Sequence, residues 1–483
     1  MQYRISPWWW ALGIILGLRL VSMAWLPLAG TTEPRYAEVA RLMVTTGDWI
    51  TPWFSPGVPF WGKPPFAFWS EALSFKALGI TEFAARLPSW LATVATLALI
   101  FNFARSYFGD RVAKCSLLIY STCALTYIAA GAVLTDPFLA LATTWAMVAF
   151  AMASKEFKWQ WRYGFFAAMA MGLLAKGPLM LALVAGPLIP VLIGHPSARE
   201  TFKQLPWLAG LALMLVLSVP WYVLAELKTP GFLDYFLVGE HFLRFVDSGW
   251  AGDLYGTAHQ RMKGAIWGDV LLASFPWGVV ALFLLMRRVV DPVQRPSLRQ
   301  ALRDPNKAYL LAWAFFTPVF FSFAGNILWT YVLPALAAFS ILMALAVVEW
   351  SGRINFERRM LFAFASITPL VVAGYMVLLA AQPQRLKTEK DLVAYAMQHM
   401  RPGEKLAFLG SKSFSAAFYS QGRAEEITME NLILRLGHDK TLYLAVPKGN
   451  FETVSKSLGT QLPKVFESRE YVLTFVSRNQ PGS

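Results

Sequence analysis

The chain has 483 residues, of which 56% are hydrophobic and 15% are charged, and its mean hydropathy is +0.46. Soluble globular proteins carry about 25% charged residues, so this composition excludes an ordinary soluble protein and favours a polytopic helical membrane protein. The 20 Trp, 36 Phe and 16 Tyr exclude a disordered chain, and the presence of only two cysteines excludes a disulfide-built module.

About 11 apolar runs are long enough to cross a bilayer, and 13 is the upper count. The runs are Trp8–Leu28, Phe83–Ala104, Val112–Ala129, Thr135–Ala153, Trp161–Ala175, Leu179–Ile193, Pro206–Ala225, Ala265–Met286, Ala308–Phe323, Ile327–Val348 and Leu361–Ala381. The first is expected to be a retained helix with a cytoplasmic N-terminus, because its exit does not match a small-x-small cleavage site. The fifth and sixth are short and flank Lys176-Gly177-Pro178, so they form either a tight hairpin or one interrupted segment.

The net charge of +14 would favour nucleic-acid binding in a soluble protein. Here the basic residues fall in alternate loops between the apolar runs, and the positive-inside rule predicts that these loops are cytoplasmic. The residues are Arg105, Arg111, Lys114, Lys155, Lys158, Arg162, Arg199, Lys203, Arg287, Arg288, Arg295, Arg299, Arg303, Lys307, Arg353, Arg358 and Arg359. No single basic face remains, so nucleic acid is not an expected partner.

Three stretches are predicted on the opposite, extracytoplasmic side, namely residues 30–82, 228–264 and 382–483. In the first, Arg35–Val44 and Phe66–Leu78 alternate apolar and polar residues at helical spacing, so they are expected to be helices that lie in the membrane interface. The predicted fold is therefore an all-α polytopic membrane domain, residues 1–381, followed by a small soluble α/β extracytoplasmic domain, residues 382–483.

The C-terminal stretch has short apolar runs that alternate with helical patterns, which is typical of a small α/β unit. The expected strands are Lys405–Leu409, Thr441–Val446 and Tyr471–Val476, and the expected helices are Asp391–His399, Met429–Leu436 and Phe451–Leu458. No glycine-rich phosphate loop follows any of these strands, so no chemistry is assigned to this region.

Two acidic residues stand at outer ends of apolar segments. Glu33 is followed by Pro34, which suits the first turn of a helix, where the helix dipole stabilises an anion. Asp136 precedes Pro137 at a tight transmembrane turn. Each acid is either a capping charge or a functional group, because ionisable residues at membrane depth are costly and usually line a cavity.

A single lysine, Lys63, lies between Trp61 and the stiff Pro64-Pro65 pair, which restricts the freedom of its ammonium group. A fixed cation at this surface suits an anionic head group such as a phosphate, and the alternative is a snorkelling interfacial lysine.

The segment Gly239-Glu240-His241-Phe242-Leu243-Arg244 lies in the second outer stretch. If the segment is helical, Glu240 and Arg244 are four residues apart and can pair. In the alternative, Arg244 grips a phosphate in bidentate fashion and His241 serves as a ligand or proton carrier. A Glu-His neighbour pair alone is a weak signal for a metal.

Tyr331 opens a late span and belongs either to an aromatic belt or to a site. Lys176 and Arg19 are further candidate cavity charges. With Lys63 and Arg244, these residues place several cations on the same face as the two acids. The residues by themselves therefore suggest a site for a lipid-linked phosphate, with a general base nearby.

Short motifs that follow one another through most of the chain carry a family resemblance. They are Glu33-Pro34-Arg35-Tyr36-Ala37-Glu38, Gly47-Asp48-Trp49, Lys63-Pro64-Pro65, Phe83-Ala84-Ala85-Arg86-Leu87-Pro88, the turn at Asp136, Lys176-Gly177, Pro220-Trp221-Tyr222, Glu240-His241 with Arg244, and Tyr331-Val332-Leu333-Pro334. In these motifs the sequence resembles the GT-C fold glycosyltransferases that use polyprenyl-phosphate sugars, in particular family 39-like dolichyl-phosphate-mannose protein mannosyltransferases and bacterial lipid A aminoarabinose transferases. The resemblance covers about residues 1–380, and the run from Glu33 to Pro88 is specific.

The resemblance implies an inverting transfer of a sugar from an undecaprenyl-phosphate donor to an acceptor at the outer face of a bacterial inner membrane. The donor phosphate would be bound by Lys63, Arg244, Tyr331 and Arg35. Stabilising the charge that develops on this leaving group would be the largest catalytic effect.

Glu33 or Asp136 would be the catalytic carboxylate that orients or deprotonates the acceptor. Lys176, His241 and Glu240 are further cavity candidates. The expected partners are the polyprenyl-phosphate-sugar donor, lipid A or a protein as acceptor, and membrane lipids.

Two positions depart from the family pattern. Thr32 stands where the family usually has the first of two acids, and Gly62 stands where it often has Glu before Lys-Pro-Pro. These departures leave open whether the site has a strong base that activates a hydroxyl group and whether it binds a divalent metal. An acceptor phosphate is already anionic and needs no base, which favours lipid A over a protein hydroxyl.

A transporter or flippase of lipid-linked sugar is the alternative function. Transporters place charged residues near the middle of the bilayer and carry paired repeats with broken helices, whereas these charges gather at one interface and no repeat is evident. A receptor or scaffold would leave the grouping of Lys63 with Arg244 unexplained.

Overall fold

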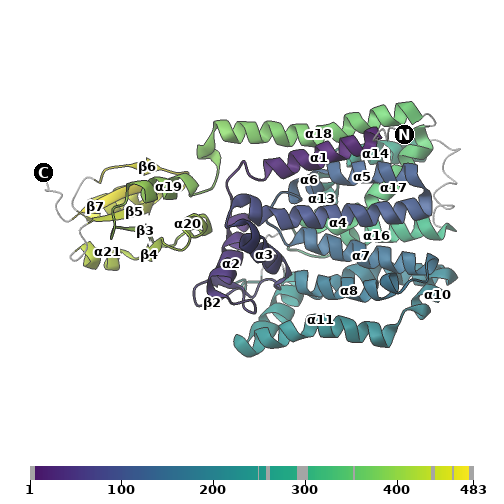
Figure 1. Cartoon of the computed structure of the whole chain (residues 1–483), viewed down its shortest axis with the longest axis horizontal. Helices are drawn as coiled ribbons and strands as arrows, with labels where there is room; N and C mark the ends of the chain where they lie inside the picture. Colours follow the sequence, from purple (N-terminus) through teal and green to yellow (C-terminus); the bar gives the residue numbers. More distant parts are fainter. Residues whose placement is uncertain are drawn as a thin grey trace.

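The computed structural model describes residues 6–247, 250–256, 261–290, 303–351, 354–436, 441–458 and 462–477. Long helices lie side by side in one bundle, and a small sheet with short helices lies beyond one end of it (Figure 1). Three of the basic loop residues named above, Arg295, Arg299 and Arg353, lie outside the described residues.

The bundle and the short elements at its end account for the described part of the chain up to Ala381. Its elements are α1 (Pro7–Ser22), α2 (Thr32–Thr46), β1 (Trp53–Ser55), β2 (Val58–Pro59), α3 (Phe66–Leu78), α4 (Glu82–Phe108), α5 (Asp110–Thr122), α6 (Ala124–Ala129), α7 (Asp136–Lys155), α8 (Trp159–Lys176), α9 (Leu179–Gly194), α10 (Pro196–Gln204), α11 (Trp207–Lys228), the π-helix η1 (Asp234–Leu243), α12 (Arg244–Val246), α13 (Ile266–Ala273), α14 (Trp277–Val290), α16 (Pro305–Phe321), the 3-10 helix η2 (Trp329–Ala335), α17 (Leu336–Ser351) and α18 (Ile354–Ala381).

Each of the eleven predicted runs overlaps a helix, but the count of eleven spans is not confirmed. Within the described residues, five helical stretches are long and apolar enough to cross a membrane. They are Glu82–Phe108, Asp136–Lys155, Trp207–Lys228, Trp329–Trp350 and Glu357–Ala381. A sixth arises if α13 and α14, which meet at an angle of 108°, are taken as one broken span.

The helical run is interrupted between α8 and α9. The sequence predicted either a tight hairpin or one interrupted segment at this point. Gly177 has a φ of +77°, in the left-handed region that glycine adopts without strain. A Cβ at this position would also lie 2.6 Å from the ring of Phe236. The segments are therefore two separate helices, and α8 ends at the buried Lys176.

The helices predicted at Arg35–Val44 and Phe66–Leu78 are confirmed as α2 and α3, and they lie at the end of the bundle nearest the sheet (Figure 1). Glycine ends both helices: Gly47 caps α2 with a φ of 73° and donates its N–H to Met43 O at 3.1 Å. The helix α10, which carries Arg199 and Lys203, lies at the opposite end of the bundle (Figure 1).

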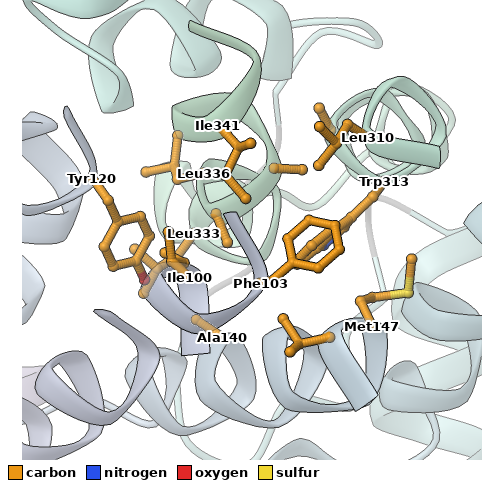
Figure 2. Close-up of a cluster of buried hydrophobic side chains, with 14 of the residues drawn as sticks. Ile100, Phe103, Tyr120, Ala140, Met147, Leu310, Trp313, Leu333, Leu336 and Ile341 are labelled. Atoms are coloured by element: carbon orange, nitrogen blue, oxygen red, sulfur yellow. The ribbon is translucent and has the colours of Figure 1, made fainter. Parts of the chain in front are cut away.

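A large apolar core joins α4, α5, α7, α16 and α17. Phe103 from α4, Tyr120 from α5, Met147 from α7 and Trp313 from α16 are among the buried side chains that face one another there (Figure 2). In a bilayer, lipid tails are as apolar as leucine, so close packing rather than transfer from water holds these helices together. This core fixes the helix ends that carry the candidate site residues.

The C-terminal region contains every strand and helix that the sequence predicted there. Its elements are the 3-10 helix η3 (Pro383–Arg385), α19 (Lys390–His399), β3 (Lys405–Leu409), α20 (Phe414–Tyr419), β4 (Glu425–Ile427), α21 (Met429–Leu436), β5 (Thr441–Pro447), η4 (Lys448–Asn450), α22 (Phe451–Ser457), β6 (Phe466–Glu467) and β7 (Tyr471–Ser477). The strand order is β4-β3-β5-β7-β6, with β3 parallel to β4 and β5, and β7 antiparallel to β5 and β6. The short elements β4, β6 and α20 were not predicted.

Hydrogen bonds tie this region to the end of the bundle. Glu82, the first residue of α4, accepts from Lys390 Nζ at 2.6 Å and from the Tyr419 hydroxyl at 3.1 Å. The same hydroxyl accepts from Leu28 N–H at 2.7 Å, and Gly30 N–H donates to Lys387 O at 2.9 Å. The sheet region is therefore held directly against the segment that joins α1 to α2.

Candidate active site

Two cations and a tyrosine hydroxyl meet around the carboxylate of Glu240 in η1. Arg244 Nη1 lies 3.0 Å from both Glu240 oxygens, which confirms the predicted pairing over four residues. Lys63 Nζ lies 3.4 Å from Glu240 Oε2, and Tyr235 donates its hydroxyl to Oε1 at 3.3 Å. The Glu240 side chain is only 5% exposed, and the two cations lower its pKa despite the opposing effect of burial.

The second partner of Arg244 is Asp253, whose Oδ2 lies 3.5 Å from Arg244 Nη1. Two cations and two carboxylates therefore balance in this group. Because Lys63 is 20% exposed and its contact with Glu240 is long, its ammonium remains the most accessible of the four.

The loop that carries Lys63 is held in place on both sides of the lysine. Trp61 donates its backbone N–H to the Tyr255 hydroxyl at 3.0 Å and its indole N–H to Thr229 Oγ1 at 3.0 Å. After Lys63 the two prolines lead directly into α3. A Cβ on Gly62 would lie 3.1 Å from the Phe60 ring and 3.3 Å from Tyr255 Cδ2, so aromatic rings fill the space where the related pattern has a glutamate.

A second ion pair joins the ends of α7 and α8. Asp136 Oδ1 accepts from Lys176 Nζ, and both residues are 7% exposed. The Lys176 ammonium also lies 4.8 Å from the centre of the Tyr331 ring. Removing either charge of such a buried pair leaves the other uncompensated, which costs about 3–5 kcal/mol.

Two contacts connect the ion pairs. His241, which follows Glu240, has its Nε2 3.0 Å from Lys176 O, and the Lys176 ammonium lies 4.8 Å from the centre of the Tyr331 ring. The two ion pairs are therefore neighbours, whereas Glu33, which was expected to join them, pairs with Arg86.

Arg35 and Tyr36 border the same site. Arg35 Nη1 donates to Tyr255 O at 2.7 Å, and its guanidinium lies 5.4 Å from the Tyr36 ring centre and 5.8 Å from that of Phe60. Burial raises the pKa of Tyr36, against the charges of Arg35 and Lys176. Tyr36 was not among the predicted site residues, although it stands in the Pro-Arg-Tyr motif that could have indicated it.

Glu33 lies in a different group, around Arg86. Its Oε1 accepts from Arg86 Nε at 3.0 Å and from Val133 N–H at 3.1 Å, and its Oε2 accepts from Arg86 Nη2 at 2.8 Å. Arg86 also donates to the carbonyl oxygens of Met23, Leu26 and Pro27 at 2.7–3.0 Å. These bonds join α4 to the connection between α1 and α2, and Val133 ties the turn before α7 to the same group.

Two further buried charged side chains, Arg19 and Glu71, also need placing. Arg19, a predicted cavity charge, donates to Ile128 O at 2.8 Å and lies 5.6 Å from the Tyr127 ring, so it joins α1 to α6. Glu71 on α3 was not predicted; it is 1% exposed, and neither of its carboxylate oxygens has a hydrogen-bond partner. Burial, with a smaller effect from the charge of Glu33, raises the pKa of Glu71 well above its ordinary value.

The ring nitrogens of His241 are both engaged. Nδ1 lies 2.8 Å from Phe236 O, and Nε2 lies 3.0 Å from Lys176 O. Burial lowers the pKa of His241, while these two carbonyls act in the opposite direction. The carboxylates of the site are paired with cations, namely Glu240 and Asp253 with Arg244 and Asp136 with Lys176. Among the described residues no group of three or more His, Cys, Asp or Glu side chains could hold a metal ion, and the donor set does not fit one.

Comparisons with known proteins agree with the motifs. Residues 62–223 match the family described as dolichyl-phosphate-mannose-protein mannosyltransferase. The undecaprenyl phosphate-alpha-4-amino-4-deoxy-L-arabinose arabinosyl transferase of Yersinia pestis (strain Pestoides F) is 28% identical over 381 residues, covering 76% of this chain and 63% of that protein. The transferase of the same name from Aeromonas hydrophila is 33% identical over 349 residues, covering 70% of this chain and 60% of that protein. The chain thus matches less than two thirds of the length of these relatives.

Two solved structures share the architecture. ArnT from Cupriavidus metallidurans bound to undecaprenyl phosphate superposes with a TM-score of 0.80 over 98% of both chains at 18% identity. The archaeal oligosaccharyltransferase AglB from Archaeoglobus fulgidus superposes with a TM-score of 0.52 over 94% of this chain and 71% of its own, at 11% identity. The chain therefore has the GT-C fold, and the predicted resemblance to the glycosyltransferases that use polyprenyl-phosphate sugars is confirmed.

Proposed function

We propose that this chain is an integral membrane glycosyltransferase, which transfers a sugar from a polyprenyl-phosphate donor, such as an undecaprenyl-phosphate sugar, to an acceptor at the extracytoplasmic face. The observation that carries the proposal is the charged group of Lys63, Glu240 and Arg244, which lies in one site with the Asp136–Lys176 pair. The relatives named as arabinosyl transferases, and the ArnT structure bound to undecaprenyl phosphate, support the same donor class.

Lys63 and Arg244 bind the donor phosphate in this proposal, with Tyr331 and Arg35 at its border. The acceptor oxygen attacks the anomeric carbon, the bond from that carbon to the phosphate oxygen breaks, and its electron pair stays on the phosphate. The configuration at the anomeric carbon is inverted. The two cations stabilise the charge that this leaving group gains, and fixed charges in a site shielded from water do so most effectively.

Of the two predicted catalytic carboxylates, Asp136 and Glu33, Asp136 is the better supported. It lies in one site with the cations and is 7% exposed, whereas the oxygens of Glu33 are occupied by Arg86 and Val133. With a hydroxyl acceptor, the Asp136 carboxylate orients the hydroxyl group and takes its proton. With a phosphate acceptor no proton is transferred, and Lys176 balances the added negative charge.

The remaining topological features belong to the same proposal. The chain makes eleven crossings of the bacterial inner membrane, with a cytoplasmic N-terminus. Residues 1–381 form the transferase domain, and residues 382–483 form an extracytoplasmic α/β domain. The basic loops and the position of the sheet, at the end of the bundle opposite α10, support this orientation (Figure 1). A periplasmic reporter fused after Ser483 is expected to be active.

A reconstitution assay tests the function. Purified protein in proteoliposomes, given undecaprenyl-phosphate aminoarabinose and lipid A, is expected to yield glycosylated lipid A and free undecaprenyl phosphate, detected by mass spectrometry. A flippase would move the donor between leaflets without forming either product. The gene can also be deleted in a strain that normally expresses it. Unchanged glycolipids and glycoproteins after the deletion would contradict the transferase assignment.

A further inference from the structure

One tyrosine, Tyr255, is bonded to the segments that carry three of the residues expected to bind the donor phosphate, namely Lys63, Arg35 and Arg244. Its hydroxyl accepts from the backbone N–H of Trp61, two residues before the lysine, at 3.0 Å. Its carbonyl oxygen accepts from Arg35 Nη1 at 2.7 Å. Its N–H donates to Asp253 Oδ1 at 2.9 Å, and the other oxygen of Asp253 lies 3.5 Å from Arg244 Nη1. The position of Tyr255 therefore affects where all three cations stand.

The ring of Tyr255 packs against the β1-β2 hairpin. Its centre lies 4.7 Å from that of Phe60, directly after β2, and 5.0 Å from that of Phe54 in β1. The two strands have only three and two residues, and their pairing register shifts within β1. An isolated two-stranded hairpin is at best marginally stable. The place of this hairpin, and of the loop that follows it to Lys63, therefore depends on side chains that pack against it from elsewhere.

One such side chain comes from the C-terminal region. Phe414, the first residue of α20, meets Phe54 edge to face, with ring centres 4.8 Å apart and an angle of 79° between the rings. Aromatic pairs prefer this arrangement over a face-to-face sandwich. The short helix α20 lies on the side of the C-terminal region that faces α2 (Figure 1). Phe54 thus contacts one ring of the C-terminal region and one ring of the donor site.

The helix that carries Phe414 is held firmly on both sides. Ser415 Oγ accepts from Glu389 N–H at 2.9 Å, which joins α20 to the start of α19. On the other side, a Cβ on Gly422 would lie 3.0 Å from Arg41 Nη2, so the turn after α20 lies directly on α2. Phe414 is therefore presented to the hairpin from a fixed support.

We propose that Phe414 is a positioning residue of the donor site. Through Phe54 and Tyr255, it holds the loop that carries Lys63 at the distance from Arg35 that the donor phosphate requires. Cations that are fixed before the phosphate arrives stabilise its charge without reorganisation, which makes them more effective than mobile ones. The inference rests on the proposed transferase function, and it gives the C-terminal region a part in donor binding.

Binding of the lipid tests the inference without requiring transfer. Undecaprenyl phosphate is titrated into the purified full-length protein in detergent, and undecaprenol, which lacks the phosphate, is titrated in parallel. Phe414→Ala is expected to weaken undecaprenyl phosphate binding about tenfold, or 1.4 kcal/mol, and to leave undecaprenol binding unchanged. Phe414→Leu keeps apolar bulk against Phe54 and is expected to recover most of the affinity.

A second variant tests the path in a protein whose C-terminal region is intact. Phe54→Ala is expected to weaken undecaprenyl phosphate binding as much as Phe414→Ala does. The double variant is expected to bind about as weakly as either single variant, because the two rings act in series and their effects do not add. A loss of about a hundredfold in the double variant would mean that the rings act independently, which overturns the path through Phe54.

A matched control separates positioning from general loss of stability. Phe451 is 4% exposed in another core of the C-terminal region, a cluster of buried side chains that includes Leu432 and Leu444. Phe451→Leu is expected to lower the melting temperature and to leave undecaprenyl phosphate binding unchanged. If this variant weakens binding as much as Phe414→Ala does, the loss follows from stability alone and the positioning role is overturned.

The outcomes distinguish this inference from the transferase function. Unchanged undecaprenyl phosphate binding by Phe414→Ala overturns the inference, even if the wild type transfers sugar. Equal loss of undecaprenol binding overturns it too, because the phosphate-binding cations are then not the cause. Selective loss of undecaprenyl phosphate binding supports it even where the wild type transfers no sugar. A wild type that binds undecaprenyl phosphate no better than undecaprenol overturns the donor assignment and the inference together.

Discussion

Two buried ionic groups at the same end of the bundle differ in how completely their bonds are used. In the Glu33–Arg86 group, the guanidinium makes five hydrogen bonds to the carboxylate and to three carbonyls, and Arg86 is 6% exposed. In the Lys63–Glu240–Arg244 group, the Lys63 side chain is 20% exposed, and its ammonium donates to Gly62 O and lies 3.4 Å from the Glu240 carboxylate. The first group is saturated, and the second can exchange a partner.

This difference separates structure from function better than burial or charge does. A saturated pair has no lone pair or N–H left for a ligand, so it can only hold the chain together. An incompletely bonded cation loses little when a phosphate replaces its carboxylate partner. The predictions below test this division, beginning with the largest expected effect.

The first prediction concerns the saturated group. Glu33→Ala leaves the guanidinium of Arg86 buried without its counter-charge, which is expected to lower the free energy of unfolding by about 3–5 kcal/mol. Thermal unfolding in detergent measures the loss. The exposed pair Glu200–Lys203 supplies the control, since Glu200→Ala is expected to change stability by less than about 0.5 kcal/mol. A Glu33→Ala protein that keeps its stability but loses transfer would place Glu33 with the functional residues.

The second prediction concerns the accessible cation. Lys63→Ala is expected to reduce sugar transfer at least about 100-fold, or about 2.7 kcal/mol, because the leaving phosphate loses one of its two cations. Its melting temperature is expected to stay close to that of the wild type. Lys158→Ala, which removes an exposed lysine paired with Glu156, is the matched control. Full transfer by the Lys63 variant would remove the donor-phosphate assignment.

The third prediction asks whether Glu240 competes with the donor. Glu240→Gln removes one negative charge beside Lys63 and Arg244, so the affinity for undecaprenyl phosphate is expected to rise about tenfold, or 1.4 kcal/mol. Equilibrium binding of the labelled lipid measures the change. Weaker binding would mean instead that Glu240 holds the two cations in position, and the group would then resemble the saturated one.

The smallest expected effect lies in the C-terminal region, at Glu389. Burial raises the pKa of Glu389 to about 7 from an ordinary value of 4.5, so the folded protein binds this proton more tightly than the unfolded chain does. Its contribution to stability is therefore complete below pH 4.5 and is lost as the pH rises towards 7, at no more than about 1.4 kcal/mol per pH unit. Melting temperatures of wild type and Glu389→Gln across this range are expected to converge at low pH. Parallel curves would contradict the assignment.

Local patterns predicted much of this fold. The strand Lys405–Leu409 and the helix Phe66–Leu78 have the predicted bounds, because alternation and helical spacing act over a few residues. The 108° bend between α13 and α14 was not predicted, since the whole stretch is apolar enough to read as one span, although Pro276 lies at the break. A count of apolar runs does not give the number of spans, because buried segments in a bundle can be short.

The site was predicted in part because its residues are chemically conspicuous. Charged side chains among apolar runs identified Lys63, Arg244 and Asp136. The partner of Glu33 was not predicted, because Arg86 lies 53 residues further along the chain and only tertiary structure joins them. The burial of Glu71 was not predicted either, because a carboxyl group in an amphipathic helix is expected to face water rather than the core.

The aromatic packing around Gly62 couples position 62 to two neighbouring rings. A side chain there requires the rings of Phe60 and Tyr255 to shift by a few tenths of an ångström, while the Tyr255 hydroxyl is held by Pro59 O at 2.8 Å. In the present arrangement, the carboxylate beside Lys63 therefore comes from Glu240, 178 residues further along the chain than Gly62, so the acid can be changed independently of the loop that carries the lysine.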